Sequence, residues 1–168
     1  YLVDQINLSP FVSVIGADKF SVVFYPSANN MTVFNLENVA ALLTLSGFSI
    51  DCTATGVTGI HGKFTNLFKI ESIRFMGCKT NFILDQGGWN RVSNCTSVSN
   101  SAGILGAGSF WIGSTDQTKY GCVLSLVENY SISIDRATQD TEMCVFHRCV
   151  ATKMSKIIGS SILDSNTL

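Results

Sequence analysis

The 168-residue chain is predicted to be all-β and to fold as a right-handed, single-stranded parallel β-helix, or β-solenoid, for three reasons. Short apolar runs rich in Val, Ile and Phe recur between clusters of Gly, Asn and Ser, which is the pattern of strands and turns. Only 14% of the residues are charged, whereas solvent-facing helices usually carry many Lys and Glu residues. Neighbouring runs also resemble one another at a spacing of roughly 20–25 residues, which suits one solenoid coil.

The runs that we expect to be strands are distributed over the whole chain. Pro10 and Pro26 stand at the boundaries of runs, where a missing N–H group does not interrupt a ladder. The one segment that could be a helix is 36–45, although no clear cap precedes it. The expected strands are 11–15, 21–25, 31–34, 42–45, 48–50, 67–70, 73–75, 82–84, residue 92, 110–112, 122–127, 132–134 and 144–146.

The repeat is clearest in the middle of the chain. Residues 45–52 and 70–78 share an alternation of apolar and polar residues that ends in a cysteine, and this aligns Phe48 with Ile73. Residues 90–98 read as a degenerate third copy with Val92 at the equivalent position. Two glycine-containing segments, 58–62 and 102–106, are expected to be corners between sheets. A β-sandwich is the main alternative, but its hairpins favour Asn-Gly and Asp-Gly turns, and neither dipeptide occurs.

We expect residues 1–168 to form a single β-helical unit that is a fragment of a longer chain, because the sequence starts without Met or a signal peptide. The rungs are clearest in 42–106. The remainder, 107–168, is less regular and is expected to hold an insertion or a change of architecture.

The six cysteines contain no C-x-x-C pair, and four of them follow one another at intervals of 26, 17 and 27 residues. This spacing predicts an interior stack of one cysteine per coil, and we favour buried thiols over disulfides by about two to one because free Cys is mostly buried. His147 lies between Cys144 and Cys149, but residues so close along a strand alternate between its faces. No metal site and no cofactor are therefore expected.

The charge distribution argues against two classes of partner. The net charge is −1, and the eleven Lys and Arg residues are scattered, whereas nucleic-acid binding requires clustered positive charge. No apolar run reaches the length of about eighteen residues that a transmembrane helix needs, so we expect no membrane insertion.

Residues 42–106 resemble the rungs of pectate-lyase-like β-helices, in particular those of the phage tailspike and capsule depolymerase family. The similarity rests on segments 45–51, 59–61, 68–75 and 90–95, and it is one of pattern, so no catalytic residue is carried over. The resemblance implies a homotrimeric receptor-binding protein of the virion tail that binds, and possibly depolymerises, a bacterial surface polysaccharide. A secreted polysaccharide lyase or hydrolase of the same fold is one alternative, and a non-catalytic structural or adhesive solenoid is another.

Polysaccharide cleavage needs a pair of carboxylates, or a base beside a uronate. Because residues on adjacent coils stack about 4.8 Å apart, equivalent positions can supply such a pair. The catalytic candidates are Asp51, Glu71 and Asp85, with Asp51 at the end of one strand and Glu71 at the start of a later one. Whether the chain is an enzyme stays open, because such carboxylates are mostly exposed, solvated residues. An enzyme of this kind would be a glycoside hydrolase or a polysaccharide lyase.

The segment most typical of a glycan site is 84–91. Its indole can stack on a sugar ring, and its guanidinium can hold a carboxylate with two hydrogen bonds. An ordinary turn bent by Gly87 and Gly88 is the alternative, and for this segment it is favoured by about three to two. The glycan-binding candidates are Gln86, Trp89, Arg91, Trp111 and Tyr120.

Overall fold

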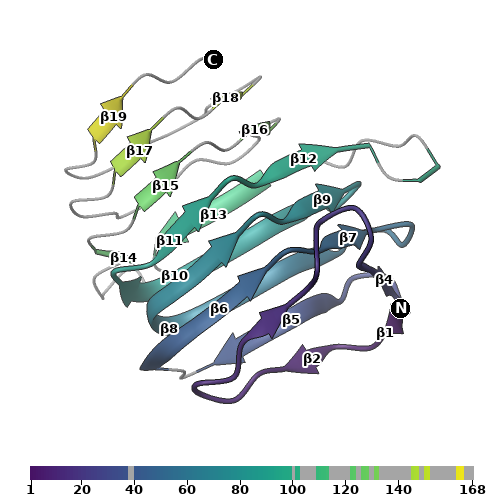
Figure 1. Ribbon diagram of the computed structural model, residues 1–168, viewed down its shortest axis with the longest axis horizontal. Coiled ribbons are helices and arrows are strands. Elements are labelled where there is room, and N and C mark those ends of the chain that lie inside the picture. The colour runs from purple at the N-terminus through teal and green to yellow at the C-terminus, as the bar shows by residue number, and fades with distance from the viewer. Residues whose placement is uncertain are drawn as a thin grey trace.

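The computed structural model describes residues 1–37, 40–99, 101–102, 109–113, 122–123, 126–128, 131–132, 145–147, 150–151 and 162–164, and side chains up to residue 102 except at 40, 41 and 86. Among these residues all strand pairings are parallel and no helix occurs. The predicted parallel β-solenoid is confirmed: successive coils lie side by side from the N-terminal to the C-terminal end (Figure 1).

The larger sheet has twelve strands in two arms, and the long strand β8 (Thr58–Glu71) runs through both arms. The first arm contains β2 (Ile6–Asn7), β5 (Thr32–Glu37), the first part of β8, β10 (Thr80–Gly88), β13 (Ser109–Gly113) and β14 (Cys122–Val123). The second arm contains β3 (Val14–Ile15), β6 (Ala40–Ser46), the second part of β8, β11 (Arg91–Ser93), β15 (Leu126–Glu128), β17 (Val145–His147) and β19 (Ile162–Asp164).

The other sheet has seven strands and closes each coil. Its strands are β1 (Leu2–Val3), β4 (Val23–Pro26), β7 (Ser49–Asp51), β9 (Arg74–Met76), β12 (Thr96–Val98), β16 (Ser131–Ile132) and β18 (Val150–Ala151). A typical coil therefore passes along the first arm, the second arm and the seven-stranded sheet before it starts the next coil.

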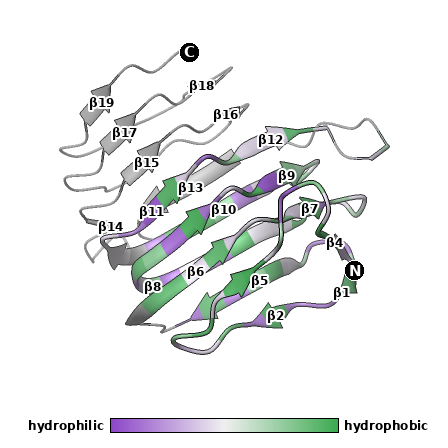
Figure 2. Ribbon diagram, viewed as in Figure 1, coloured by the Kyte–Doolittle hydropathy of each residue, from purple (hydrophilic) through white to green (hydrophobic). Residues whose placement is uncertain are grey.

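The core consists of apolar residues that occupy equivalent positions on successive coils. Each fully buried side chain of this size contributes about 1.5–3 kcal/mol relative to an exposed one. Because strand residues alternate between faces, one apolar residue in two is enough to fill the interior, and hydrophobic stretches alternate with polar ones along the strands (Figure 2). The stacked core sets are Phe34, Ile60 and Phe82 in the first arm, Leu45, Ile70 and Val92 in the second, and Ile50 and Phe75 in the seven-stranded sheet.

A single left-handed residue per coil makes the corner between the second arm and the seven-stranded sheet. Gly47, Ser72 and Asn94 have φ values of 72°, 53° and 55°. Their backbones are stacked, since the Gly47 amide donates to the Glu71 carbonyl at 3.3 Å and the Ser72 amide donates to the Ser93 carbonyl at 3.0 Å. Gly and Asn tolerate this conformation best, which explains part of the Gly- and Asn-rich composition.

The register confirms one alignment of the predicted repeat and corrects another. Ser49 pairs with Arg74, so Phe48 is equivalent to Ile73 as predicted. Thr96 pairs with Arg74, so Cys95 is equivalent to Ile73, and Val92 pairs instead with Ile70. The third copy was therefore misaligned by three residues, because both alternatives place a buried apolar residue in the core.

One expectation about local structure was wrong, and one possibility did not occur. Residues 58–62 are the start of β8 and make no corner. Gly59 is needed for space, because a Cβ atom there would lie 2.9 Å from the Phe75 ring. Segment 36–45 is not helical, since β5 ends at Glu37 and β6 begins at Ala40. The expected corner at 102–106 lies almost entirely outside the described residues.

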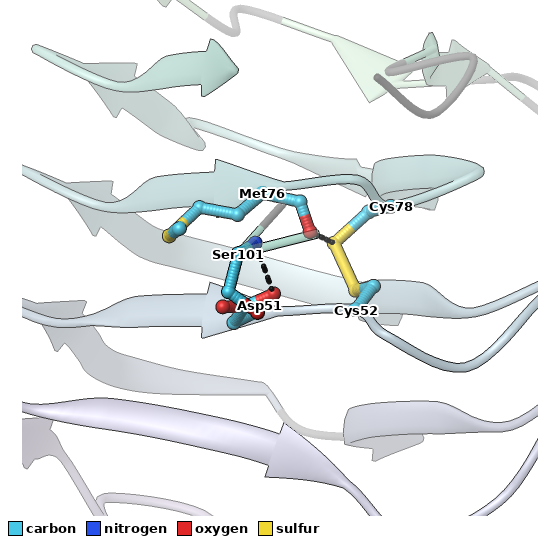
Figure 3. Close-up of a disulfide and its surroundings, with 5 residues drawn as sticks. All are labelled: Asp51, Cys52, Met76, Cys78 and Ser101. Carbon is cyan, nitrogen blue, oxygen red and sulfur yellow. Dashed lines mark hydrogen bonds between the residues drawn. A yellow bond between two sulfur atoms is a disulfide. The ribbon is translucent and has the colours of Figure 1, made fainter. Parts of the chain in front are cut away.

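The cysteines do not form the predicted interior stack, because Cys95 is equivalent to Ile73 and Cys122 pairs with Gly87, and two of the others are bonded. Cys52 and Cys78 form a disulfide between adjacent coils, with Cα atoms 5.2 Å apart, where we had favoured buried thiols (Figure 3). Cys95 is the predicted buried thiol, and burial raises its pKa to about 12. Cys122 is described only as a backbone position in β14, and Cys144 and Cys149 lie outside the described residues.

Candidate binding face on the first arm

A column of alternating charges lies on the outer face of the first arm. Glu37 pairs in register with Lys63, and Lys63 pairs with Asp85. The residue before each of them is buried, namely Leu36, Gly62 and Leu84, so alternation puts the charged column on the face that points away from the core. At the usual strand spacing, the Cα atoms of Glu37 and Asp85 are roughly 9.6 Å apart, with Lys63 between them.

His61 lies in the adjacent outer column, on the same strand as Lys63, and pairs in register with Asn35 and Ile83. Its side chain is half-buried. Burial lowers the pKa of His61, and the negative charges of Asp85 and Glu37 offset part of this effect. The imidazole is therefore neutral at pH 7, with one nitrogen that can donate a hydrogen bond and one that can accept.

Amide side chains extend this face onto the preceding coil. The Asn35 side-chain nitrogen donates to Oδ1 of Asn7 at 3.2 Å, and the Gln5 side-chain nitrogen donates to the same oxygen at 2.8 Å. The Lys63 ammonium lies 5.6 Å from the ring centre of Phe64, which is partly exposed. Carboxylate, ammonium, imidazole and amide groups thus occur together on one side of four neighbouring coils.

We call Phe11, Leu42, Leu67 and Trp89 the apolar ridge; these residues occupy equivalent positions beside this face, at the corner between the two arms. Their exposed fractions are 72%, 68%, 50% and 57%. Phe11, Leu67 and Trp89 have φ values of 64°, 57° and 53°, a conformation that costs bulky residues about 1–2 kcal/mol each. Strained, exposed apolar residues often mark functional surfaces, so the apolar ridge belongs to the candidate site.

Asp85 is the one catalytic candidate that lies on the binding face. Its side chain is only 1% exposed and stands next to Lys63 in the column.

The other two catalytic candidates lie elsewhere and are not stacked on each other. Asp51 ends β7 as expected, but it is buried and accepts a hydrogen bond from the Ser101 backbone at 3.3 Å (Figure 3). Glu71 ends β8 instead of opening a strand, and it forms an ion pair with Lys69 at 2.6 Å. Asp51 pairs with Met76, five residues after Glu71, so the two carboxylates occupy different sheets.

The glycan-binding candidates are divided between the two arms. Trp89 is part of the apolar ridge, and Arg91 is exposed at the start of β11 in the second arm. Gln86 in β10 and Trp111 in β13 are described as backbone positions, and Trp111 pairs with Ile83 on the first arm. Tyr120 lies outside the described residues.

Glu37, His61 and Lys63 were missed as site residues from the sequence. A signal for them does exist: segments 32–37, 58–63 and 80–85 each begin with Thr, place Phe or Ile third and end in a charged residue. Aligning these segments gives the register that the structure has.

No group of three metal-ligating side chains occurs where side chains are described, and no helix of the described residues is long and apolar enough to cross a membrane. Compared with known proteins, the chain matches no protein-family model, no curated protein and no solved structure. The architecture itself is clear: the chain is a parallel β-solenoid.

Proposed function

We propose that this chain is an extracellular polysaccharide-binding β-solenoid that holds a glycan across the outer face of the first arm. The observation that carries the proposal is the column Glu37–Lys63–Asp85 with His61 beside it. Sugar hydroxyl groups both donate and accept hydrogen bonds, and this face offers both kinds of partner on consecutive coils. The exposed rings of Phe11 and Trp89 on the apolar ridge provide surfaces on which a sugar ring can stack.

Two further features support an extracellular role. The Cys52–Cys78 disulfide is typical of proteins that fold in oxidising compartments. A solenoid presents an extended surface, which suits a long polymer better than a small metabolite. The resemblance to phage tailspikes adds the proposal of a homotrimer on a virion tail whose ligand is a bacterial surface polysaccharide, an argument from fold-level analogy.

Binding to a panel of bacterial surface polysaccharides, measured with Lys63→Met and Glu37→Gln variants, tests the proposal. Losing a hydrogen bond to a charged group costs about 1.5–3 kcal/mol, so each variant should bind roughly 10–100-fold more weakly. Lys69→Met is the matched control, because Lys69 is a partly exposed lysine on the second arm. Equal weakening by the control, or unchanged binding in both site variants, would show that the ligand is not held on this face.

Hydrolysis is a second candidate function, favoured by the spacing of two carboxylates. Glu37 and Asp85 stand two coils apart, roughly 9.6 Å at Cα, and side chains that lean toward each other from this spacing can bring their carboxyl groups to the separation of about 6.5–9.5 Å found in inverting glycosidases. Release of reducing ends should then disappear in Glu37→Gln and Asp85→Asn. If reducing ends are never released by the wild-type chain, the face only binds. If the products carry an unsaturated uronate, the reaction is an elimination and not a hydrolysis.

A further inference from the structure

The first coil is longer than the next one at the corner between the second arm and the seven-stranded sheet. Gly16 stands at the position of Gly47, and Val23 stands at that of Ser49. Gly47 and Ser49 are two positions apart in the chain, whereas Gly16 and Val23 are seven apart, so the first coil holds five extra residues. We call this insertion, residues 17–21, the corner loop. Insertions into the coils of a solenoid form loops on one face, which is often the face that binds a ligand.

Hydrogen bonds hold the corner loop in one conformation. The Asp18 carboxylate accepts at Oδ1 from the backbone amides of Phe20 at 2.6 Å and Ser21 at 3.0 Å, and at Oδ2 from the Ser21 hydroxyl group. These hydrogen bonds, with that of the Ser21 hydroxyl group as the largest cause, lower the pKa of Asp18. The Ser49 hydroxyl group of β7 donates to the Lys19 carbonyl, which ties the loop to the seven-stranded sheet. The loop is therefore already ordered before it meets a ligand, which lowers the entropy lost on binding.

The corner loop carries an exposed aromatic ring with two cationic neighbours. Phe20 is 70% exposed, although phenylalanine is usually buried. The Lys19 ammonium lies 5.7 Å from the centre of the Phe20 ring, and the guanidinium carbon of Arg74 in β9 lies at the same distance. The two cationic groups are thus no farther apart than twice this distance. Attraction between a cation and the face of an aromatic ring keeps both groups beside Phe20.

Both cationic groups are available to a ligand. Their side chains are partly exposed, and neither Lys19 nor Arg74 forms an ion pair or a side-chain hydrogen bond with a described residue. The carboxylate of Asp18 accepts its hydrogen bonds from the corner loop itself, and Glu71, three residues before Arg74, is paired with Lys69 at 2.6 Å. Two neighbouring positive charges repel each other, and a bound anion removes this repulsion.

We propose that Arg74, Lys19 and Phe20 bind an acidic sugar residue of a glycan. A guanidinium group holds a carboxylate through two parallel hydrogen bonds, and an ammonium group adds a further charge-assisted hydrogen bond. The apolar C–H face of the sugar ring packs on the exposed ring of Phe20. Thr96 is partly exposed and pairs in register with Arg74, so its hydroxyl group is a partner for the sugar hydroxyl groups. This site involves the seven-stranded sheet, so it is separate from the binding face on the first arm and does not depend on the function proposed for that face.

Binding of uronate-containing tetrasaccharides to the intact chain, each compared with its neutral, carboxyl-reduced form, tests the proposal. We expect the acidic form to bind at least about 10-fold more tightly, because a hydrogen bond between charged groups is worth roughly 10–100-fold. Arg74→Gln and Lys19→Gln should each remove most of this preference, and Arg74→Lys should keep part of it, because lysine retains the charge without the two parallel hydrogen bonds. Phe20→Ala should weaken the binding of both forms by about 2–10-fold, since it removes only the stacking of the ring.

Two lysine variants are the controls. Lys79 is an exposed lysine in the turn between β9 and β10, so Lys79→Gln makes the same change of charge away from the corner loop and should leave the preference for the acidic form unchanged. Lys63→Met alters the binding face on the first arm, and it should leave this preference unchanged as well.

Four results would overturn the site. The first is that no uronate tetrasaccharide binds the wild-type chain more tightly than its neutral form, a comparison that needs no variant and decides even if a variant misfolds. The second is a preference for the acidic form that survives in both Arg74→Gln and Lys19→Gln. The third is an equal loss of preference in Lys79→Gln, which would indicate general attraction to positive charge. The fourth is a loss in Lys63→Met alone, which would put the acidic sugar on the first arm and so support the proposed function while contradicting this site.

Discussion

Removing the Cys52–Cys78 disulfide should lower the stability of the solenoid by about 3.5 kcal/mol. The bond closes a loop with a sequence separation of 26 residues, slightly more than one coil. The entropy that such a cross-link removes from the unfolded chain is worth about 3 kcal/mol for 15 residues and about 4.7 kcal/mol for 100 residues, so this loop lies near the lower value. The bonded residues already belong to adjacent coils, so the native fold does not need the bond for its geometry.

Urea unfolding followed by circular dichroism, with and without reductant, measures this contribution. For a slope of about 2 kcal/mol per molar urea, a loss of 3.5 kcal/mol lowers the midpoint by roughly 1.7 M. The variant Cys52→Ala/Cys78→Ala should have the midpoint of the reduced wild-type chain, both with and without reductant. This variant is also the control for the remaining cysteines, because any further effect of the reductant on it comes from other bonds.

Two outcomes would refute the reasoning. The first is peptide mapping of the oxidised chain that does not find Cys52 linked to Cys78, which would show that the pairing is wrong. The second is a midpoint that stays unchanged after complete reduction of this bond. The loop-closure argument would then fail, because the unfolded chain would already hold these coils together.

Three other perturbations test the core, the corner and the binding face. Phe82→Ala should lower the free energy of unfolding in urea by about 3–5 kcal/mol, because Phe82 is fully buried. The control Phe64→Ala, at an exposed corner, should lower it by less than about 1 kcal/mol. Gly87→Ala should cost about 2–3 kcal/mol, because Gly87 has φ 143° and a Cβ atom would lie 2.1 Å from the Thr65 carbonyl oxygen; a wild-type midpoint would contradict this close approach. The pKa of His61 is lowered in the folded chain, so on acidification the unfolded chain takes up the proton first. The stability of the fold should therefore fall as the pH drops from about 6.5 to the folded pKa. His61→Asn should remove that part of the pH dependence.

The strand positions could be predicted because alternation of apolar and polar residues is a local property. The predicted runs 42–45, 67–70 and 82–84 all lie inside strands. The apolar residues alone do not fix the register, because a core column accepts different side chains. Ile60 stands between Phe34 and Phe82, and Gly62 stands between Leu36 and Leu84, where a Cβ atom would come within 3.3 Å of the Leu84 side chain.

The site residues were harder to predict because the coils differ in length. Glu37 and Lys63 are 26 residues apart, whereas Lys63 and Asp85 are 22 apart. On the second arm the interval is 35 residues from Ser93 to Glu128 and 19 from Glu128 to His147. No fixed period reveals such columns, and local motifs do not reveal them either, because each residue comes from a different coil.

The signs alternate along the outer column of the first arm, and this bears on what the face can bind. In the column Glu37–Lys63–Asp85, each carboxylate-bearing position has a lysine as its registered neighbour. A column of alternating sign has little net charge with which to attract an ion. Hydroxyl groups, by contrast, can donate to a carboxylate and accept from an ammonium group. A ligand for this face should therefore be rich in hydroxyl groups.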